Sequence, residues 1–245
     1  MDVKGTQYLI DNFHSPHYPS LMARLARIVA PGTPHHVTQR GNRRQKTFFA
    51  DEDYQLYKNL VAEYCAEESV AVWAYCLMPN HVHLILVPKR ADGLARALGE
   101  AHRRYSKHVN EREDWRGFLW QGRFASAPMD EEHTLAAARY VEFNPVRARL
   151  VKSPEAWRWS SAAAHLSGRD DGLAAAKPML EMAGGVRGWR KLLAQGLAPE
   201  EADVIRKAER TGRPMGDREF EKALEKKLKR PIAKQKPGPR VERGT

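Results

Sequence analysis

Hydrophobic and polar positions follow two different periods along the first two thirds of the chain. Short runs rich in β-branched and aromatic residues alternate with longer runs in which apolar residues recur every three or four positions. The short runs predict strands and the long runs predict helices. Strands are expected over residues 34–40, 70–77, 81–87 and 122–129, and helices over residues 51–68, 94–111 and 131–143.

The order of these elements is strand, helix, strand, strand, helix, strand, helix. This is the split βαβ, or ferredoxin-like, order, so we expect an α+β fold in which an antiparallel sheet carries helices on one face. Asp130 is a typical N-cap for the last of these helices. Pro145 is expected to end or kink that helix, because a proline pushes the residue before it out of the helical conformation.

The pattern thins after residue 161. Residues 162–202 predict a helical extension of the fold, with short helices over 162–166, 178–182 and 189–194. Residues 203–245 predict a basic tail, since they hold 14 Lys or Arg and 7 Asp or Glu. One apolar stripe in this tail favours a helix, and it consists of Phe220, Leu224 and Leu228. The tail is expected to be partly disordered, because few core-forming residues follow Pro231.

Residues 1–21 are mixed and polar with no clear period, and we expect them to be a disordered extension. The main domain is therefore predicted over residues 22–161. Two lone cysteines, Cys65 and Cys76, give no disulfide framework, so a reducing cytoplasm is the expected location. No apolar run is long enough to span a membrane, and no membrane partner is expected.

The chain carries 41 Lys or Arg against 30 Asp or Glu, a net charge of +11. An excess of cations on this scale favours polyanions, of which nucleic acid is the commonest. A soluble protein with a basic surface would have the same composition, so charge alone does not decide between the two.

A pair of histidines on a predicted strand is the first candidate for chemistry. Residues i and i+2 of a strand point to the same face, so His81 and His83 project side by side and form half of a divalent metal site. Two histidines can also share a solvated face without a metal. Nucleotide hydrolases with three alternating histidines are disfavoured, because Ile85 stands where the third histidine would be.

A tyrosine on the last predicted helix is the second candidate. Tyr140 and Asn144 are four residues apart and therefore share one helix face, where a phenol could act as a nucleophile beside an amide ligand of a metal. The alternative is a packed core aromatic followed by a helix cap. Tyr105, in a basic helix, is a weaker candidate nucleophile, because no partner for a metal lies one turn away from it.

Four separated motifs in this order resemble the single-tyrosine HUH transposases. They are His36-Val-Thr-Gln-Arg40-Gly-Asn42, Met78-Pro79-Asn80-His81-Val82-His83-Leu84, Trp120-Gln-Gly-Arg-Phe124 and Arg139-Tyr140-Val-Glu-Phe-Asn144-Pro145-Val146-Arg147. Within that family the closest resemblance is to the REP-associated, insertion-sequence-200-like class, and it covers roughly residues 22–161.

The resemblance implies an enzyme that cuts and transfers single-stranded DNA through a covalent 5′-phosphotyrosine. It implies that Tyr140 is the nucleophile and that His81, His83 and Asn144 bind a divalent metal, Mg²⁺ or Mn²⁺. The expected partner is single-stranded or hairpin DNA. A homodimer that shares helices is possible, and the sequence does not decide between it and a monomer.

Basic residues near these motifs are the candidate contacts to DNA phosphates. Each one could also be ordinary solvated charge. The candidates are Arg40, Arg43, Arg44, Arg103, Arg104, Lys107 and Arg123.

Three other functions remain open from the sequence. A ferredoxin-like sheet also serves as a non-catalytic DNA- or RNA-binding module. Another HUH nickase would form the same phosphotyrosine, although nothing in the chain resembles the Walker A loop of the helicases that such enzymes often carry. A metal-dependent hydrolase would cut DNA and release free ends.

Overall fold

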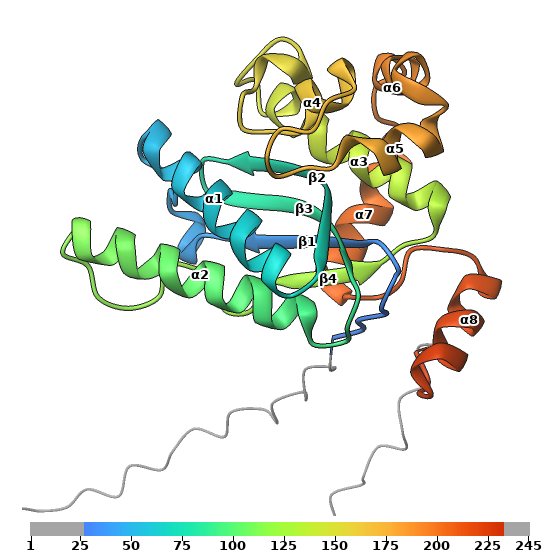
Figure 1. Cartoon of the computed structure of the whole chain (residues 1–245), viewed down its shortest axis with the longest axis horizontal. Coiled ribbons are helices and arrows are strands. Elements are labelled where there is room, and N and C mark those ends of the chain that lie inside the picture. The colour runs from blue at the N-terminus through green and yellow to red at the C-terminus, as the bar shows by residue number, and fades with distance from the viewer. Residues whose placement is uncertain (1–26, 233–245) are drawn as a thin grey trace, which may run out of the picture.

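The structure, a computed structural model, describes residues 27–232. The predicted disorder of residues 1–21 and of the end of the tail lies outside the described residues. The first seven helices and strands follow the predicted order (Figure 1). They are β1 (His35–Arg40), α1 (Asp51–Glu67), β2 (Val70–Met78), β3 (His81–Pro88), α2 (Gly93–Arg112), β4 (Ala125–Pro128) and α3 (Glu131–Arg147).

Short helices and two longer ones complete the described part of the chain. A 3-10 turn, η1 (Asn42–Arg44), follows β1. After α3 come η2 (Pro154–Ala156), α4 (Ala162–Ser167), α5 (Ala176–Ala183), α6 (Gly185–Ala194), α7 (Pro199–Thr211) and α8 (Arg218–Leu228).

The sheet has the strand order β2-β3-β1-β4, and each neighbouring pair is antiparallel. The α+β, ferredoxin-like expectation is therefore confirmed. Two central strands, β1 and β3, pair along their length, from His35 opposite Leu86 to Arg40 opposite His81. This pairing brings the first and second predicted motifs together, although more than 40 positions separate them in the sequence.

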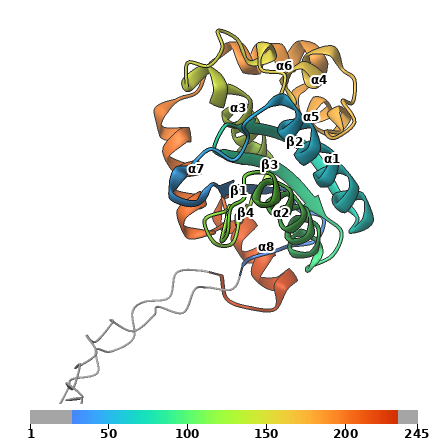
Figure 2. The ribbon, with the colours of Figure 1, turned by 90° about the vertical axis from the view of Figure 1, so that its left-hand side faces the viewer.

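Helices cover both faces of the sheet (Figure 2). On one face α1 and α2 pack against Val37, Val82 and Leu84. The sequence predicted helices on one face, with the last helix against an edge or a face of the sheet. The second face is apolar as well, since Ala74 and Ile85 point to it, and α3, α5, α6 and α7 bury it.

The predicted basic tail is folded over much of its length. The boundary expected at residue 203 falls inside α7, whose buried side chains Ala202, Ile205 and Ala208 join the core behind the sheet. The predicted apolar stripe lies on α8, where Leu224 is buried in a small cluster with Ala30. The tail therefore supplies part of the fold, because each helix has an apolar side to bury.

Pro145 does not end α3, which was one of the two effects expected from the sequence. The helix runs on to Arg147, and the backbone N–H of Ala148 still donates to the carbonyl of Asn144 at 2.9 Å. A proline here removes a single helical hydrogen bond. Since much of α3 is buried, packing against the sheet outweighs that loss.

A buried carboxylate fixes α3 to the helices that follow it. Glu142 is fully buried and accepts hydrogen bonds from the Ser161 hydroxyl (2.7 Å), from His165 Nδ1 (2.5 Å) and from Trp189 Nε1 (3.1 Å). His165 Nε2 lies 3.1 Å from the carbonyl oxygen of Trp73 on β2. One side chain of α3 thus joins α4, α6 and the sheet.

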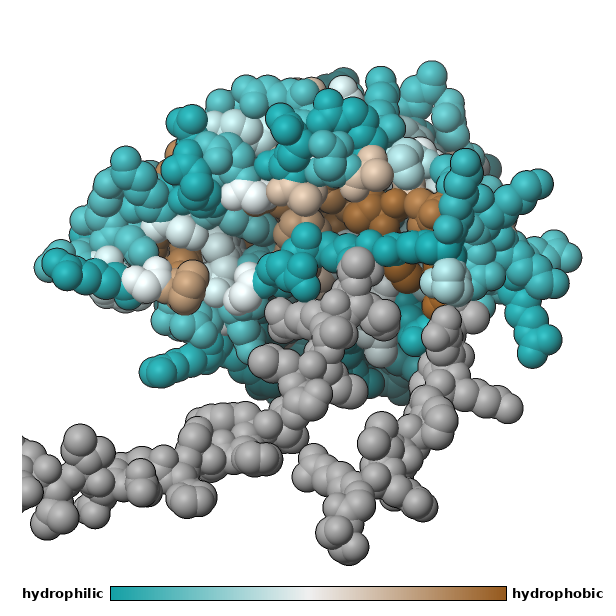
Figure 3. All heavy atoms as spheres, turned by 90° about the horizontal axis from the view of Figure 1, so that it is seen from below, coloured by the Kyte–Doolittle hydropathy of each residue, from teal (hydrophilic) through white to brown (hydrophobic). Residues whose placement is uncertain are grey.

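Among the described residues, no helix has the length and apolar character needed to cross a membrane. Viewed from below, the described surface is mainly hydrophilic, with an apolar patch near its middle (Figure 3).

Replacing Glu142 with alanine should destabilise the fold by about 3–5 kcal/mol, because three buried donors lose their acceptor and His165 loses its anionic partner. Urea unfolding followed by tryptophan fluorescence measures the change. Glu181→Ala is the matched control, since that carboxylate is exposed and pairs only with Lys177, and it should alter stability by less than about 0.5 kcal/mol. Equal stability of the two variants would contradict the role given to Glu142.

Candidate functional site

The histidines of the site lie on the face of the sheet that α3 covers. Thr38 is opposite His83 and Arg40 is opposite His81, and opposed residues of an antiparallel pair project to the same face. His36 precedes Thr38 by two positions and so shares that face. The His81 and His83 rings are 5.0 Å apart between centroids.

Each ring of the predicted pair has one nitrogen already in contact with a neighbour. His83 Nδ1 lies 3.1 Å from His36 Nε2, and these two rings are stacked. His81 Nδ1 lies 2.6 Å from the side-chain oxygen of Asn80. Within the described part of the chain, Nε2 of His81 and Nε2 of His83 form no hydrogen bond. Both Nε2 atoms are therefore available as ligands.

Burial keeps these imidazoles neutral near pH 7. It lowers the pKa of His36 and of His81 to about 4, and the charge of Arg40 adds to the effect on His81. It lowers the pKa of His83 well below the ordinary value, with further contributions from the neighbouring histidines and arginines. Neutral imidazole is the form that binds metals.

The predicted nucleophile lies against two of these rings. The Tyr140 ring packs edge-on to His83, with 5.6 Å between centroids, and edge-on to His36, at 6.2 Å. Its side chain is 5% exposed. The guanidinium of Arg147 lies over the ring, 4.6 Å from its centroid. Burial and the Glu209 carboxylate raise the pKa of Tyr140, while Arg147 opposes that rise.

Asn144 lies one helical turn after Tyr140, on the same side of α3. The residue is buried, and its side-chain nitrogen finds no hydrogen-bond partner among the described residues. An unsatisfied amide in a buried position is uncommon and fits a residue that serves a ligand. Its role as a metal ligand stays a prediction.

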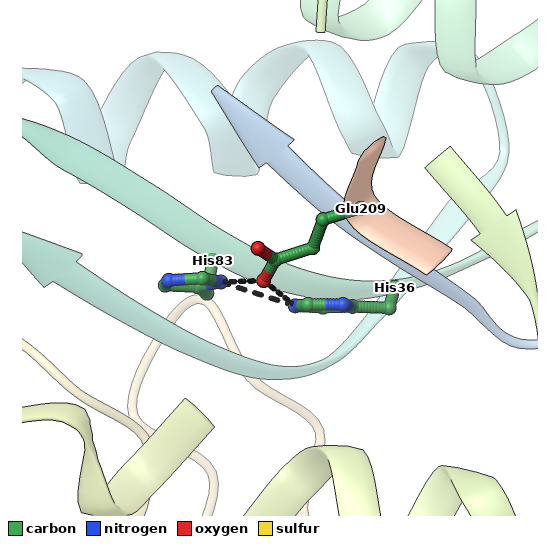
Figure 4. A group of neighbouring side chains, drawn as sticks. All are labelled: His36, His83 and Glu209. Atoms are coloured by element: carbon green, nitrogen blue, oxygen red, sulfur yellow. Dashed lines mark hydrogen bonds and ion pairs between the residues drawn. The ribbon is translucent and has the colours of Figure 1, made fainter. Parts of the chain in front are cut away.

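A carboxylate from α7 completes the cluster, and the sequence did not predict it. Glu209 Oε1 lies 3.6 Å from His83 Nδ1 and 4.0 Å from His36 Nε2 (Figure 4). This oxygen makes no hydrogen bond with any described residue. Burial raises the pKa of Glu209 to about 7, and the positive charges of Arg40, Arg147 and Arg206 limit that rise.

The donor groups fit a divalent cation in two ways that share His83. The first set is the predicted one, with Nε2 of His81, Nε2 of His83 and the Asn144 side chain. The second set consists of His36, His83 and Glu209, whose ligand atoms all lie within 4.8 Å of one another. Both sets contain neutral imidazole nitrogen and side-chain oxygen, a donor mixture that suits Mn²⁺ and Zn²⁺ better than Mg²⁺.

Comparison with known families identifies the segment that carries these residues. Residues 32–144 match the family described as "Transposase IS200 like". This segment is similar to IS200-like transposases, and it is called the transposase domain below. It includes the histidines, Tyr140 and Asn144 and stops well before Glu209. The resemblance read from the four motifs is confirmed, and it supports a role in DNA transposition.

One solved structure agrees with the fold of the transposase domain. A REP-associated tyrosine transposase bound to a REP hairpin is 20% identical with a TM-score of 0.52, over 63% of this chain and 92% of that one. A Deinococcus radiodurans R1 protein provisionally described as a transposase is 22% identical over 44% of this chain and 88% of that one. Its TM-score of 0.35 is too low to bear on the fold. The search of curated proteins found no match.

Of the predicted DNA contacts, Arg40 lies closest to the cluster, since its charge acts on the pKa of His81, His83 and Glu209. Arg43 and Arg44 are exposed in η1, and Asn80 holds this turn beside His81 by donating to the Arg44 carbonyl at 3.0 Å. These positions suit contacts to a strand that enters the site.

The predicted contacts on α2 lie on the opposite face of the sheet. Arg103 and Arg104 pair with Glu100, and Lys107 pairs with Glu111. They are exposed and remain predictions for a second part of the DNA rather than for the reacting phosphate. Arg123, just before β4, is also exposed.

The rival nucleophile has no access to the site. Tyr105 is fully buried among the α1 and α2 side chains, and its hydroxyl donates to the carbonyl of Thr47 at 2.6 Å. Burial raises the pKa of its phenol far above the ordinary range. Both facts favour Tyr140 as the nucleophile of the two.

Sequence reasoning missed the roles of three residues. His36 and Arg147 stood inside the quoted motifs, but only the strand register and the helix geometry show what they touch. Glu209 carried no signal, since it lies in a stretch of mixed charge far from the motifs.

Titration of the protein with Mn²⁺ by isothermal calorimetry tests the two donor sets. His83→Ala should abolish binding, because His83 belongs to both. If His81 and His83 hold the cation, His81→Ala should abolish binding as well, while Glu209→Gln should weaken it by about 10–100-fold through the orientation of His83. His108→Ala, an exposed histidine on α2, is the control. Loss of binding in Glu209→Gln with normal binding in His81→Ala would instead assign the cation to the second set.

Proposed function

We propose that this chain cuts single-stranded DNA with Tyr140 as the nucleophile, holds one end as a covalent 5′-phosphotyrosine and joins it to another end. The observation that carries this proposal is the packing of the Tyr140 ring against His83 and His36 of the same chain. A phenol that contacts the ring of a candidate metal ligand is placed to attack a phosphate bound at that metal. No second copy of the chain is needed to supply the tyrosine.

We assign the divalent cation, Mn²⁺ or Mg²⁺, to Nε2 of His81 and of His83, with Asn144 as a further ligand. The Nδ1 atoms of both rings already contact protein groups, which leaves Nε2 for the cation. Metal-binding histidines commonly use their second nitrogen in this way. Glu209 and His36 then fix the orientation of the His83 ring. When bound, the cation supplies polarisation of a non-bridging phosphate oxygen.

The reaction conserves the phosphodiester bond energy. The Tyr140 oxygen forms a bond to phosphorus, the bond from phosphorus to the 3′ oxygen breaks, and that oxygen leaves as a 3′-hydroxyl after gaining a proton. The phenol must lose its own proton, and Arg147 over its ring stabilises the resulting negative charge. Attack of a 3′-hydroxyl on the phosphotyrosine reverses the chemistry without ATP, which suits strand transfer.

Hairpin-containing single-stranded DNA is the partner that this function requires. The similar REP-associated transposase is bound to a REP hairpin, and the present chain has a net charge of +11. Arg40, Arg43 and Arg44 flank the site on the side of η1 and suit a single strand. Action in the cytoplasm and assembly as a homodimer remain predictions.

A covalent adduct on denaturing gels tests the proposal. We expect the protein to take up label from a pool of 3′-labelled oligonucleotides, each with a hairpin followed by a randomised strand, when Mn²⁺ or Mg²⁺ is present. A 5′ label should be released instead, because only the downstream end joins Tyr140. Tyr140→Phe should remove the adduct and keep DNA binding, since only the hydroxyl is lost.

Tyr105→Phe is the matched control, because it removes a phenol hydroxyl away from the site and should keep the adduct. A normal adduct in Tyr140→Phe would show that another residue is the nucleophile. DNA binding with no adduct in the wild type would favour the non-catalytic binding module, and strand scission with no adduct would favour the hydrolase.

A further inference from the structure

A separate cavity of about 420 Å³ lies at the outer edge of β4, beyond the histidine cluster. One wall is formed by residues 123–126, which lead into and begin β4. The other walls are formed by residues 209–213 at the end of α7 and by residues 230–232 after α8. Both of these segments, and the lining residues Arg27 and Ile28, lie outside the part of the chain that matches the transposase family.

Five arginines line this cavity, and Glu209 is the one carboxylate among its lining residues. Three of the arginines hold the walls together: Arg27 stacks on Phe124 with 3.7 Å to the ring centroid, Arg213 donates to the Ile232 carbonyl, and Arg230 donates to the Arg27 carbonyl. The other two are Arg123 and Arg210, both exposed, and neither makes a hydrogen bond or ion pair with a described residue.

One buried polar atom at the inner end of the cavity, Glu209 Oε1, has no partner among the residues that the structure describes. Unsatisfied buried groups are rare in folded proteins. The Ser126 side chain is opposite Val37 and therefore points to the face that α1 and α2 cover, away from Glu209. The guanidinium groups are thus the phosphate donors that the cavity offers.

One residue belongs both to the cavity wall and to the histidine cluster. Glu209 lines the cavity and also contacts His83 and His36. A strand whose scissile phosphate lies at Tyr140 could therefore continue past Glu209 to Arg210, the next residue of α7. The volume is within the range of pockets that hold one small ligand, roughly 300–1,000 Å³.

We propose that this cavity binds a phosphodiester group of the single strand next to the scissile phosphate, with Arg123 and Arg210 as its donors. The assignment rests on the function proposed above. It gives the region between α7 and α8 a specific role, which is to hold the flanking nucleotide rather than to act as a diffuse basic tail.

Binding of a fluorescein-labelled thymidine oligonucleotide of about 20 nucleotides to full-length Tyr140→Phe protein tests this assignment. The double variant Arg123→Ala/Arg210→Ala should lose about tenfold or more in affinity. The slope of log affinity against log salt should fall in magnitude by about 0.7, for one phosphate contact on a single strand.

The matched control is Arg187→Ala/Lys191→Ala, two exposed cations on α6 with the same change in charge. Its losses in log affinity and in salt slope should each be less than half of the losses of Arg123→Ala/Arg210→Ala. Equal losses in the two double variants, or no loss in either, would overturn the assignment. Displacement of the oligonucleotide by an equal concentration of thymidine monophosphate would assign the cavity to a free nucleotide instead.

Adduct formation by the wild type separates this inference from the proposed function. A phosphotyrosine adduct together with normal DNA binding by Arg123→Ala/Arg210→Ala would refute the role of the cavity and support the proposed function. Weakened DNA binding by that variant, with no adduct in the wild type, would support the cavity as a binding site for single strands and refute the proposed function.

Discussion

The antiparallel pairing of β1 with β3 is the constraint on which the site depends. It sets His36 and Arg40 from one strand beside His81 and His83 from the other, all on the face that α3 covers. A shift of β1 by one residue would turn His36 and Arg40 to the α1–α2 core, away from His81 and His83. Burial on this face keeps the imidazoles neutral, so that the same register fixes both the positions and the protonation of the candidate ligands.

The segments after the transposase domain complete this arrangement on the face of the sheet that α3 covers. Glu142 fastens α3 to α4 and α6, and that attachment holds Tyr140 against His36 and His83. Next, α7 brings Glu209 to the Nδ1 side of His83. The C-terminal third is thus in direct contact with the candidate site, because Glu209 lies beside the candidate ligand His83 and also lines the cationic cavity at β4.

The sequence predicts those parts of the site that local periodicity determines. Two-residue spacing gave the shared face of His81 and His83, and four-residue spacing gave the shared face of Tyr140 and Asn144. Periodicity cannot give long-range contacts, so the partners His36 and Glu209 needed the fold. It also underestimated packing: α3 continues through Pro145, and α7 buries apolar side chains in a stretch whose charge suggested a solvated tail.

Crystals of Tyr140→Phe protein with Mn²⁺ and a hairpin-containing single strand would test the central claim most directly, through anomalous scattering at the manganese edge. The account predicts one strong peak about 2.1–2.2 Å from Nε2 of His81 and of His83, with a phosphate oxygen at the same ion and the edge of the substituted ring facing that phosphate. A peak between His36, His83 Nδ1 and Glu209, or a phosphate bound far from the ring at position 140, would contradict it.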